Sequence, residues 1–354
     1  MIAGIAALWF VRVDDVYVAG SITEGDTQKA VYWKNGKVFP LPVEAQRSSA
    51  QSIYVSGKDA IVAGIEFENI PGYESELPFG KYWKNGVKHG LKFSDGYGYL
   101  MENAALCVSG GNVYQTGWAD GTNGPIAYSK NGEVTAYVTA SIGSVHSIAV
   151  EGADIYLAGF IDRSAVNNWL NDKDTGSQSS NIEPLYWKNG DDVVFLSPGK
   201  LGMVNAIQVS NSDVYTAGFI MVDGEAKATY WKNDNETVLS SDGQSISSGQ
   251  SLFVAGQDIY VAGQRSAGEN KEAVYWKNNQ ATVLGNGSSA VAASIFVLDS
   301  DVYVCGSTSN QSTGIMIACY WKNGKIKYLD NGASASADAI FVVNKPLWER
   351  LLGK

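Results

Sequence analysis

The side chains most often used in catalysis are scarce in this sequence. It holds two histidines, His89 and His146, which lie far apart along the chain. It has no His-x-x-x-His or Cys-x-x-Cys pair, no Gly-x-Ser-x-Gly segment and no phosphate-binding glycine loop. Since a nucleophile needs a base positioned beside it, these residues predict no nucleophile–base catalysis. The 36 acidic residues leave carboxylate-pair chemistry open. We expect no cofactor and favour a protein without catalysis.

Two sets of residues could bind a metal or form a covalent bridge. Asp172 and Asp174 precede Glu183 with a spacing that faintly resembles a calcium loop. A glycine stands where that loop needs a ligand, so the favoured alternative is a Ser/Asn-rich loop without metal. The three cysteines are odd in number and widely spaced: Cys107, Cys305 and Cys319. They predict buried free thiols, with a Cys305–Cys319 disulfide as the alternative.

Charge and hydropathy exclude some classes of partner. The formal net charge is −10, which repels phosphate backbones, so we expect no nucleic acid partner. No stretch is long and apolar enough to span a bilayer. Residues Met1–Phe10 are apolar, but they lack the basic region and cleavage site of a signal peptide. We interpret them as part of the fold, with any leader absent from this sequence.

The elements that position these residues come from an internal repeat. Three strings each occur seven times, in the same cyclic order, with periods of 42 to 59 residues. The first, Tyr-Trp-Lys-Asn-Gly or a near copy, begins at Tyr32, Tyr82, Tyr128, Tyr186, Tyr230, Tyr275 and Tyr320. The second, close to Asp-Val-Tyr-Val-Ala-Gly, begins at Asp15, Asp59, Asn112, Asp154, Asp213, Asp258 and Asp301. The third, small-Ile-x-Val, is carried by Ile53, Leu106, Ile148, Ile207, Leu252, Ile295 and Ile340. Repeats of this length are typical of propellers and solenoids.

Each repeat predicts four strands, which we name A to D. In the second repeat, strand A is 51–55 and strand B is 59–63. Strand C ends in Tyr-Trp-Lys in six repeats and in Tyr-Ser-Lys in the third. The Asn-Gly that follows is a strong hairpin signal and leads into a short strand D. Seven such units predict an all-β, seven-bladed β-propeller. The repeated tryptophan should lie buried between blades, and the small residue of the third string should face a crowded axis.

The ends of the chain predict how the ring closes. The first repeat begins at strand B, and its matching strand A is found at 338–343. We expect this C-terminal strand to pair with the N-terminal blade, although 8–11 could compete for the place. The domain should then span 1–344, with 345–354 as a C-terminal tail.

The repeats resemble those of the HAF-type bacterial extracellular repeat proteins. The matching text is Ala30–Gly36, Ser48–Ile53 and Val62–Gly64, and the likeness covers nearly the whole chain. It implies a propeller-like repeat fold and a secreted or cell-surface protein of a bacterium. The resemblance implies no catalytic residue, because these repeats are not defined by an activity.

Variation in repeat length predicts one candidate binding face. The A–B and C–D turns stay short, whereas the B–C and D–A connections vary and emerge on the same side of a propeller. The second B–C loop, 65–80, and the fourth, 160–184, are the longest. Non-repeat aromatics that could stack on sugars or anchor a protein gather there: Tyr73, Tyr97, Tyr99, Trp118 and Trp169. The alternative is that such aromatics seal their own loops.

A second candidate site lies on the predicted axis. The residue before the small one of each strand A is Gln51, Ala104, His146, Asn205, Gln250, Ala293 and Asp338. Five polar residues would therefore encircle one mouth of the axial channel and bind a small ligand or an ion. The favoured alternative is that they hydrogen-bond loop backbone and channel water.

Three functions follow from these sites. The first is a non-catalytic binding protein, secreted or on the cell surface, that recognises a glycan or a protein through the long-loop face. The second is a polysaccharide hydrolase or lyase that uses carboxylates on that face. The third is a structural surface-display protein without a ligand. We favour the first, and we expect a monomer.

Overall fold

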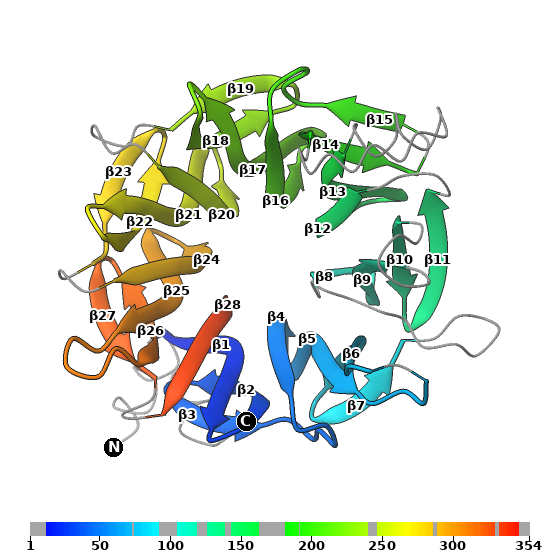
Figure 1. The fold of residues 1–354 in the computed structure, drawn as a ribbon, viewed down its shortest axis with the longest axis vertical. Helices are drawn as coiled ribbons and strands as arrows, with labels where there is room; N and C mark the ends of the chain where they lie inside the picture. Colours follow the sequence, from blue (N-terminus) through cyan, green and yellow to red (C-terminus); the bar gives the residue numbers. More distant parts are fainter. Residues whose placement is uncertain are drawn as a thin grey trace, which may run out of the picture.

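The described chain forms seven four-stranded antiparallel sheets arranged around a central axis, as Figure 1 shows. The structure is a computed structural model and describes residues 12–72, 74–91, 105–118, 126–138, 143–162, 181–190, 192–239, 246–285, 289–329 and 333–346. This architecture confirms the predicted seven-bladed β-propeller. No helix of the described residues is long and apolar enough to cross a membrane.

Each blade runs from strand A at the axis to strand D at the rim. The first three blades are β28 (Ser334–Pro346), β1 (Arg12–Glu24), β2 (Thr27–Lys34) and β3 (Lys37–Pro40); β4 (Ser48–Ser56), β5 (Asp59–Glu68), β6 (Leu77–Lys84) and β7 (Val87–Gly90); and β8 (Leu106–Ser109), β9 (Asn112–Trp118), β10 (Ile126–Lys130) and β11 (Glu133–Val138). The fourth and fifth are β12 (Gly143–Glu151), β13 (Asp154–Asp162), β14 (Ile182–Lys188) and β15 (Asp192–Phe195); and β16 (Gly202–Ser210), β17 (Asp213–Val222), β18 (Glu225–Lys232) and β19 (Asn235–Val238). The sixth and seventh are β20 (Ser247–Ala255), β21 (Asp258–Ala267), β22 (Asn270–Lys277) and β23 (Gln280–Val283); and β24 (Ala290–Leu298), β25 (Asp301–Ser309), β26 (Met316–Lys322) and β27 (Lys325–Tyr328).

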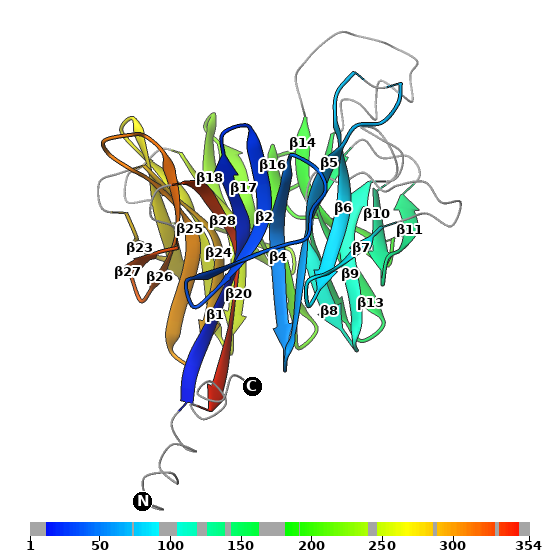
Figure 2. The ribbon, with the colours of Figure 1, turned by 90° about the horizontal axis from the view of Figure 1, so that it is seen from below.

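The connections between strands divide the molecule into two faces. The tight A–B turns and C–D hairpins lie on one side, which we call the turn face. The B–C and D–A connections lie on the other, which we call the loop face. Figure 2 shows the hairpin between β5 and β6 rising on the loop face, while β1 begins and β28 ends on the turn face.

The C-terminal strand closes the ring, as predicted. β28 pairs antiparallel with β1 from Arg12↔Pro346 to Thr23↔Ser334, which makes it the innermost strand of the first blade. The strand continues to Pro346, two residues past the boundary expected at 344. The competing segment 8–11 lies outside the described residues. Without β28, the inner edge of β1 would expose unpaired backbone groups, and this pairing covers that edge.

On the turn face, one asparagine in each blade ties strand B to the C–D hairpin. In the sixth blade, the Asn278 Oδ1 accepts the Ile259 backbone N–H at 2.9 Å, and its Nδ2 donates to Asp258 Oδ1 at 2.7 Å. Asn278 also has φ +47°, the left-handed conformation that the hairpin requires. Equivalent pairs are made by Asn35, Asn85, Asn131, Asn189, Asn233 and Asn323. The repeated Asp and Asn are therefore structural.

The repeated tryptophans fill the spaces between blades. All six are at most 1% exposed: Trp33, Trp83, Trp187, Trp231, Trp276 and Trp321. Each lies in a hydrophobic cluster that joins its own blade to the preceding one. The Trp231 indole N–H also donates to the Ser197 hydroxyl of the preceding blade at 3.0 Å. The predicted structural role of this column is confirmed.

The third blade is the exception, because Ser129 stands where the others have tryptophan. Ser129 pairs across the sheet with Gln115, whereas the tryptophans of the other blades pair with valine, leucine or threonine. Gln115 is fully buried, and its Nε2 donates to the Lys81 carbonyl of the second blade at 3.2 Å. A polar contact therefore takes part of the role that an indole has elsewhere. Within the described residues, neither Gln115 Oε1 nor Ser129 Oγ meets a hydrogen-bond partner.

Candidate functional site

The axial side chains are positioned by a β-bulge in strand A. In every blade whose inner strand is fully described, one strand-A residue has no partner on strand B. These unpaired residues are Gln51, His146, Asn205, Gln250, Ala293 and Asp338. They are the column that the sequence placed at the channel mouth, and we call them the axial ring. Because a bulge re-aims a side chain out of the normal alternation, it presents this column to the axis.

A glycine in strand B makes each bulge possible. A Cβ on Gly263 would lie 2.0 Å from the Ser248 carbonyl oxygen, closer than any real contact. The same clash, at 1.8 to 2.0 Å, would occur at Gly20, Gly64, Gly159, Gly218 and Gly306. The last residue of the Asp-Val-Tyr-Val-Ala-Gly string is therefore glycine because strand A bulges against it. The sequence shows the glycine, but the bulge that explains it was not predicted.

The axial ring lines two adjoining cavities. One, of about 200 Å³, is lined by the ring and by the small residues that follow it in strand A, such as Ser147 and Ser294. The other, of about 460 Å³, shares part of the ring and is lined also by Gln28, Ser49 and Ser336. Ser49 and Ser336 each lie two residues before a ring residue, nearer the loop face where strand A begins. The larger cavity is therefore on the loop-face side, and its three additional polar residues were not predicted.

Two ring side chains, His146 and Asn205, bind the neighbouring inner strand, whereas Gln250 and Asp338 bond to a serine of their own strand. A histidine N–H must be the donor to a carbonyl, so His146 Nδ1 donates to the Val204 oxygen at 3.0 Å. Asn205 Nδ2 donates to the Gly249 carbonyl at 2.7 Å, one blade further on. Burial lowers the pKa of His146, which is therefore neutral at pH 7. The backbone hydrogen bonds expected under the alternative reading are present, but they occupy only part of each side chain.

The small residues after the ring connect adjacent blades. Ser147 Oγ accepts the backbone N–H of Ile207 at 3.2 Å, and Ser251 and Ser294 accept equivalent N–H groups in the next blade at 3.3 and 3.4 Å. Serine in this column therefore satisfies a backbone donor that no strand reaches. The prediction from sequence was only that the position must be small.

Asp338 is the one carboxyl group among the described residues that line these cavities. Its Oδ2 accepts a hydrogen bond from Ser336 Oγ at 2.8 Å. Desolvation raises its pKa to about 6, although the Ser336 hydrogen bond partly opposes this. The carboxyl is thus ionised near pH 7 but easily protonated below it. A glycoside hydrolase commonly uses two carboxyl groups, and the described lining supplies one.

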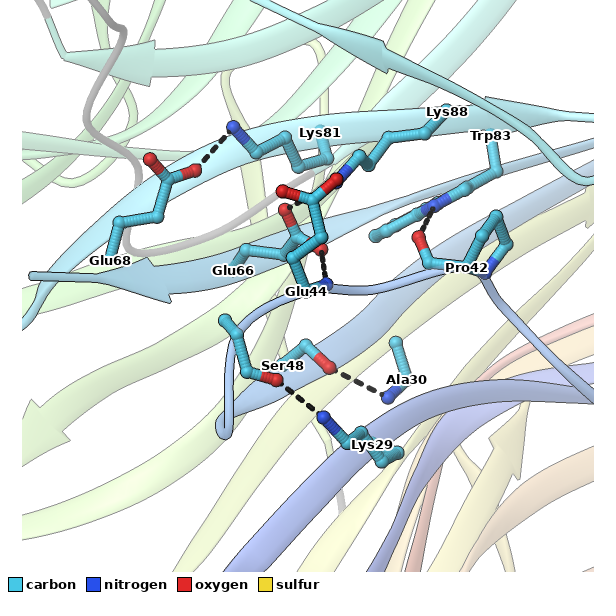
Figure 3. Close-up of polar contacts among 11 residues, drawn as sticks. Lys29, Ala30, Pro42, Glu44, Ser48, Glu66, Glu68, Lys81, Trp83 and Lys88 are labelled. Carbon is cyan, nitrogen blue, oxygen red and sulfur yellow. Dashed lines mark hydrogen bonds and ion pairs between the residues drawn. The ribbon is translucent and has the colours of Figure 1, made fainter.

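Most described charges and aromatics of the second B–C loop contact neighbouring segments of the protein. Figure 3 shows buried Glu66, which accepts the Glu44 backbone N–H at 3.2 Å and lies 3.4 Å from Lys88 Nζ. Glu68 lies 2.6 Å from Lys81 Nζ. The Arg47 guanidinium stacks 4.2 Å above the Phe67 ring. For these residues the structure favours a loop that packs against neighbouring strands and the preceding connection.

The remaining predicted site residues lie mostly outside the described residues. This applies to Tyr73, Tyr97, Tyr99, Trp169, Asp172 and Asp174. For Trp118 the structure describes the backbone, at the last position of β9. Glu183 is buried in β14, and the described residues contain no cluster of three His, Cys, Asp or Glu side chains suited to a metal. Cys107, Cys305 and Cys319 are free thiols, as predicted, so Cys305 and Cys319 form no disulfide.

Comparison with known proteins extends to the fold alone. No protein-family model matches the sequence, and no curated protein sequence matches it. A puromycin-hydrolysing peptidase of Mycobacterium tuberculosis superposes with a TM-score of 0.54 at 10% identity, over 89% of this chain and 53% of the peptidase chain. TolB from Acinetobacter baumannii gives a TM-score of 0.46 at 11% identity, over 92% and 82% of the two chains. This chain thus spans about half the length of the peptidase chain, and membership of the HAF-type family stays a prediction.

Proposed function

We propose that this protein is a non-catalytic binding propeller, secreted or on the cell surface, that takes the end of a glycan into the axial cavity from its loop face. The observation that carries the proposal is the axial ring, in which polar side chains from separate blades line one cavity. The five polar members are Gln51, His146, Asn205, Gln250 and Asp338.

The chemistry of the ring supports a ligand rich in hydroxyl groups. Carboxamide and carboxyl groups both accept hydrogen bonds, and carboxamides also donate them, so together they match the paired donors and acceptors of a sugar. The larger cavity, of about 460 Å³, falls within the size range of small-molecule sites. Loop aromatics such as Trp118 and Trp169 are proposed as stacking surfaces at the rim.

The fold itself does not require these polar residues. Ala293 occupies a ring position in the seventh blade with the same bulge as its polar counterparts. Polar side chains at the other positions are therefore not needed to form the bulge. Because the bulge forms without a polar side chain, the polar residues at the other ring positions support a binding role over a purely structural one.

A glycan array probed with the intact protein tests the proposal. We expect retention of at least one glycan class, and a loss of about tenfold or more in affinity for Gln51→Ala/Gln250→Ala. The matched control, Lys232→Ala/Lys277→Ala, removes two exposed charges on the turn face and should bind like the parent. Absence of any glycan binding, or equal loss in both variants, would overturn the proposal.

A further inference from the structure

The axial ring presents more hydrogen-bond acceptors than donors. His146 directs its Nδ1–H at the Val204 carbonyl and at the Asn205 Oδ1, at 3.0 and 3.2 Å, and Asn205 uses one amide N–H on the Gly249 carbonyl. Gln250 uses one amide N–H on the Ser248 hydroxyl, at 3.1 Å. Protein groups thus take up donors, whereas a neutral imidazole keeps Nε2 as an acceptor and the Asn205 and Gln250 carboxamide oxygens each keep at least one lone pair. The ring should therefore favour a ligand that donates hydrogen bonds.

A directed chain of hydrogen bonds leads to the one carboxylate of the cavity. Gln28 Nε2 donates to Ser21 Oγ at 2.9 Å, and Ser336 Oγ donates to Asp338 Oδ2 at 2.8 Å. The two hydroxyls lie 3.0 Å apart. Because Ser336 spends its proton on Asp338, Ser21 must be the donor between them. The chain fixes one carboxylate oxygen, while no donor in the described part of the molecule reaches the other, Oδ1.

Among the described residues, no lysine or arginine lines either cavity to balance this carboxylate. The formal net charge of the chain is −10, so the wider field also attracts cations. A calcium ion needs six to eight oxygen ligands and usually several carboxylates, which one aspartate does not supply. An organic ammonium needs only acceptors for its three N–H donors.

We propose that the axial ring selects glycans whose terminal sugar carries a free amino group, with Asp338 as the residue that binds the ammonium. This inference rests on the proposed glycan-binding function and deepens it. Asp338 Oδ1 would hold the ammonium through a charge-assisted hydrogen bond, and the carboxamide oxygens would accept its remaining protons. N-acetylation of the sugar removes the charge and two of these donors, so the acetylated sugar should bind more weakly.

Calorimetric titration of the full chain at pH 7 tests the selection. The probes are a fully deacetylated glucosamine trimer and the matching N-acetylglucosamine trimer. We expect the amino form to bind about tenfold or more tightly than the acetylated form. Asp338→Asn keeps an acceptor for Ser336 but removes the charge, and it should reduce the preference to about threefold or less. The control Asp258→Asn changes a turn-face carboxylate to the residue type found at Asn112 and should keep the full preference.

The possible outcomes distinguish failure of the amino-sugar selection from failure of the proposed glycan-binding function. If the two trimers bind equally, and Gln51→Ala/Gln250→Ala weakens both, the amine selection is overturned while glycan binding stands. If Asp338→Asn keeps the full preference, Asp338 does not bind the amine. If calcium or potassium chloride at matched ionic strength displaces the amino trimer more than sodium chloride does, the carboxylate serves a metal ion instead. If neither these trimers nor any glycan of the array binds, the proposed function itself fails.

Discussion

In the described blades the tryptophan column and the axial ring each keep one position of the repeat, yet they differ in how far their residues repeat. Six of seven blades have the same residue, tryptophan, at the interblade position, and all six are at most 1% exposed. The ring positions instead hold glutamine, histidine, asparagine, alanine and aspartate on the same bulged backbone. Repetition therefore marks what each blade needs to fold. Variation on an unchanged backbone marks side chains whose chemistry the bulge does not require.

The third blade shows that even the repeated column can be broken at one place. Ser129 and Gln115 replace an indole and a small apolar partner, and the second and third blades are joined by a hydrogen bond from Gln115 to Lys81. The remaining apolar contact comes from a cluster that includes Tyr82 and Leu91. The ring can tolerate one weaker contact between blades, because the six other interblade contacts and the closure of the ring hold every blade in place.

The largest expected effect is on the tryptophan column. Trp231→Ala should lower the free energy of unfolding by about 3–5 kcal/mol, because it empties a fully buried site and removes a hydrogen bond to Ser197. Ser129→Ala, at the equivalent site of the third blade, should be neutral or slightly stabilising, since it removes a buried hydroxyl without a described partner. Urea unfolding followed by fluorescence and circular dichroism measures both. Comparable losses of unfolding free energy in the two variants would contradict the proposed difference between these two interblade contacts.

The next effect concerns the backbone beneath the ring. Gly263→Ala should cost about 1–3 kcal/mol, because its Cβ would meet the Ser248 carbonyl and the bulge would have to shift. Gly285→Ala is the control, since nothing lies within 4 Å of its added Cβ. Thermal melting compares the two. If Gly263→Ala melts like the parent, the glycine is not what allows the bulge.

An effect of similar size and opposite sign is expected at Asp338. Its folded pKa of about 6 lies above the ordinary value of 3.8, so ionisation opposes folding. Stability should fall as pH rises from about 4 to about 6, and the loss should persist above that range. Asp338→Asn should therefore be more stable than the parent by about 1–3 kcal/mol at pH 7, with the difference vanishing near pH 4.

Other titratable groups lie near Asp338. The difference in unfolding free energy between the parent and Asp338→Asn is therefore more informative than the pH dependence of either protein alone. His146 also lines the cavity, and burial lowers its pKa, so it contributes to the same acidic range in both proteins. The Cys305 thiol, whose pKa is raised well above its ordinary value by burial and next by Asp338, stays protonated throughout. Urea unfolding at pH 4, 5, 6 and 7 gives the comparison. A constant difference across pH would mean that Asp338 does not titrate in the fold as described.

The smallest effect on stability is expected at the loop aromatics. Replacing Tyr73, Trp118 and Trp169 together by alanine should barely change the melting temperature if they form a binding surface outside the blade core. Glycan affinity should then fall by about 1–3 kcal/mol per anchor. Thermal melting and binding are measured side by side on the same preparation. Lost stability with unchanged binding would make these residues loop plugs, like Phe67 beneath Arg47.

The amino-acid sequence by itself determined the fold of this protein to the level of single strands. Three strings repeated seven times predicted the blade number, the buried tryptophans and the closing strand, because each depends on local strand and turn preferences that recur along the chain. The column of axial residues was also found from register alone. These features are periodic, and periodicity can be counted without knowing which residues touch.

How the axial residues are held could be seen only once the fold was known. The bulge that aims the ring requires that Gly263 lacks a Cβ, because a Cβ there would clash with the Ser248 carbonyl of another strand, which no local preference records. The raised pKa of Asp338 depends on burial on the axis, and its hydrogen-bond chain joins β28 to β1 and β2 across the closure of the ring. Partners more than 300 residues apart in sequence meet there only because the ring closes. For this reason the position of the axial ring could be predicted from sequence, whereas its hydrogen bonds and the raised pKa of Asp338 could not.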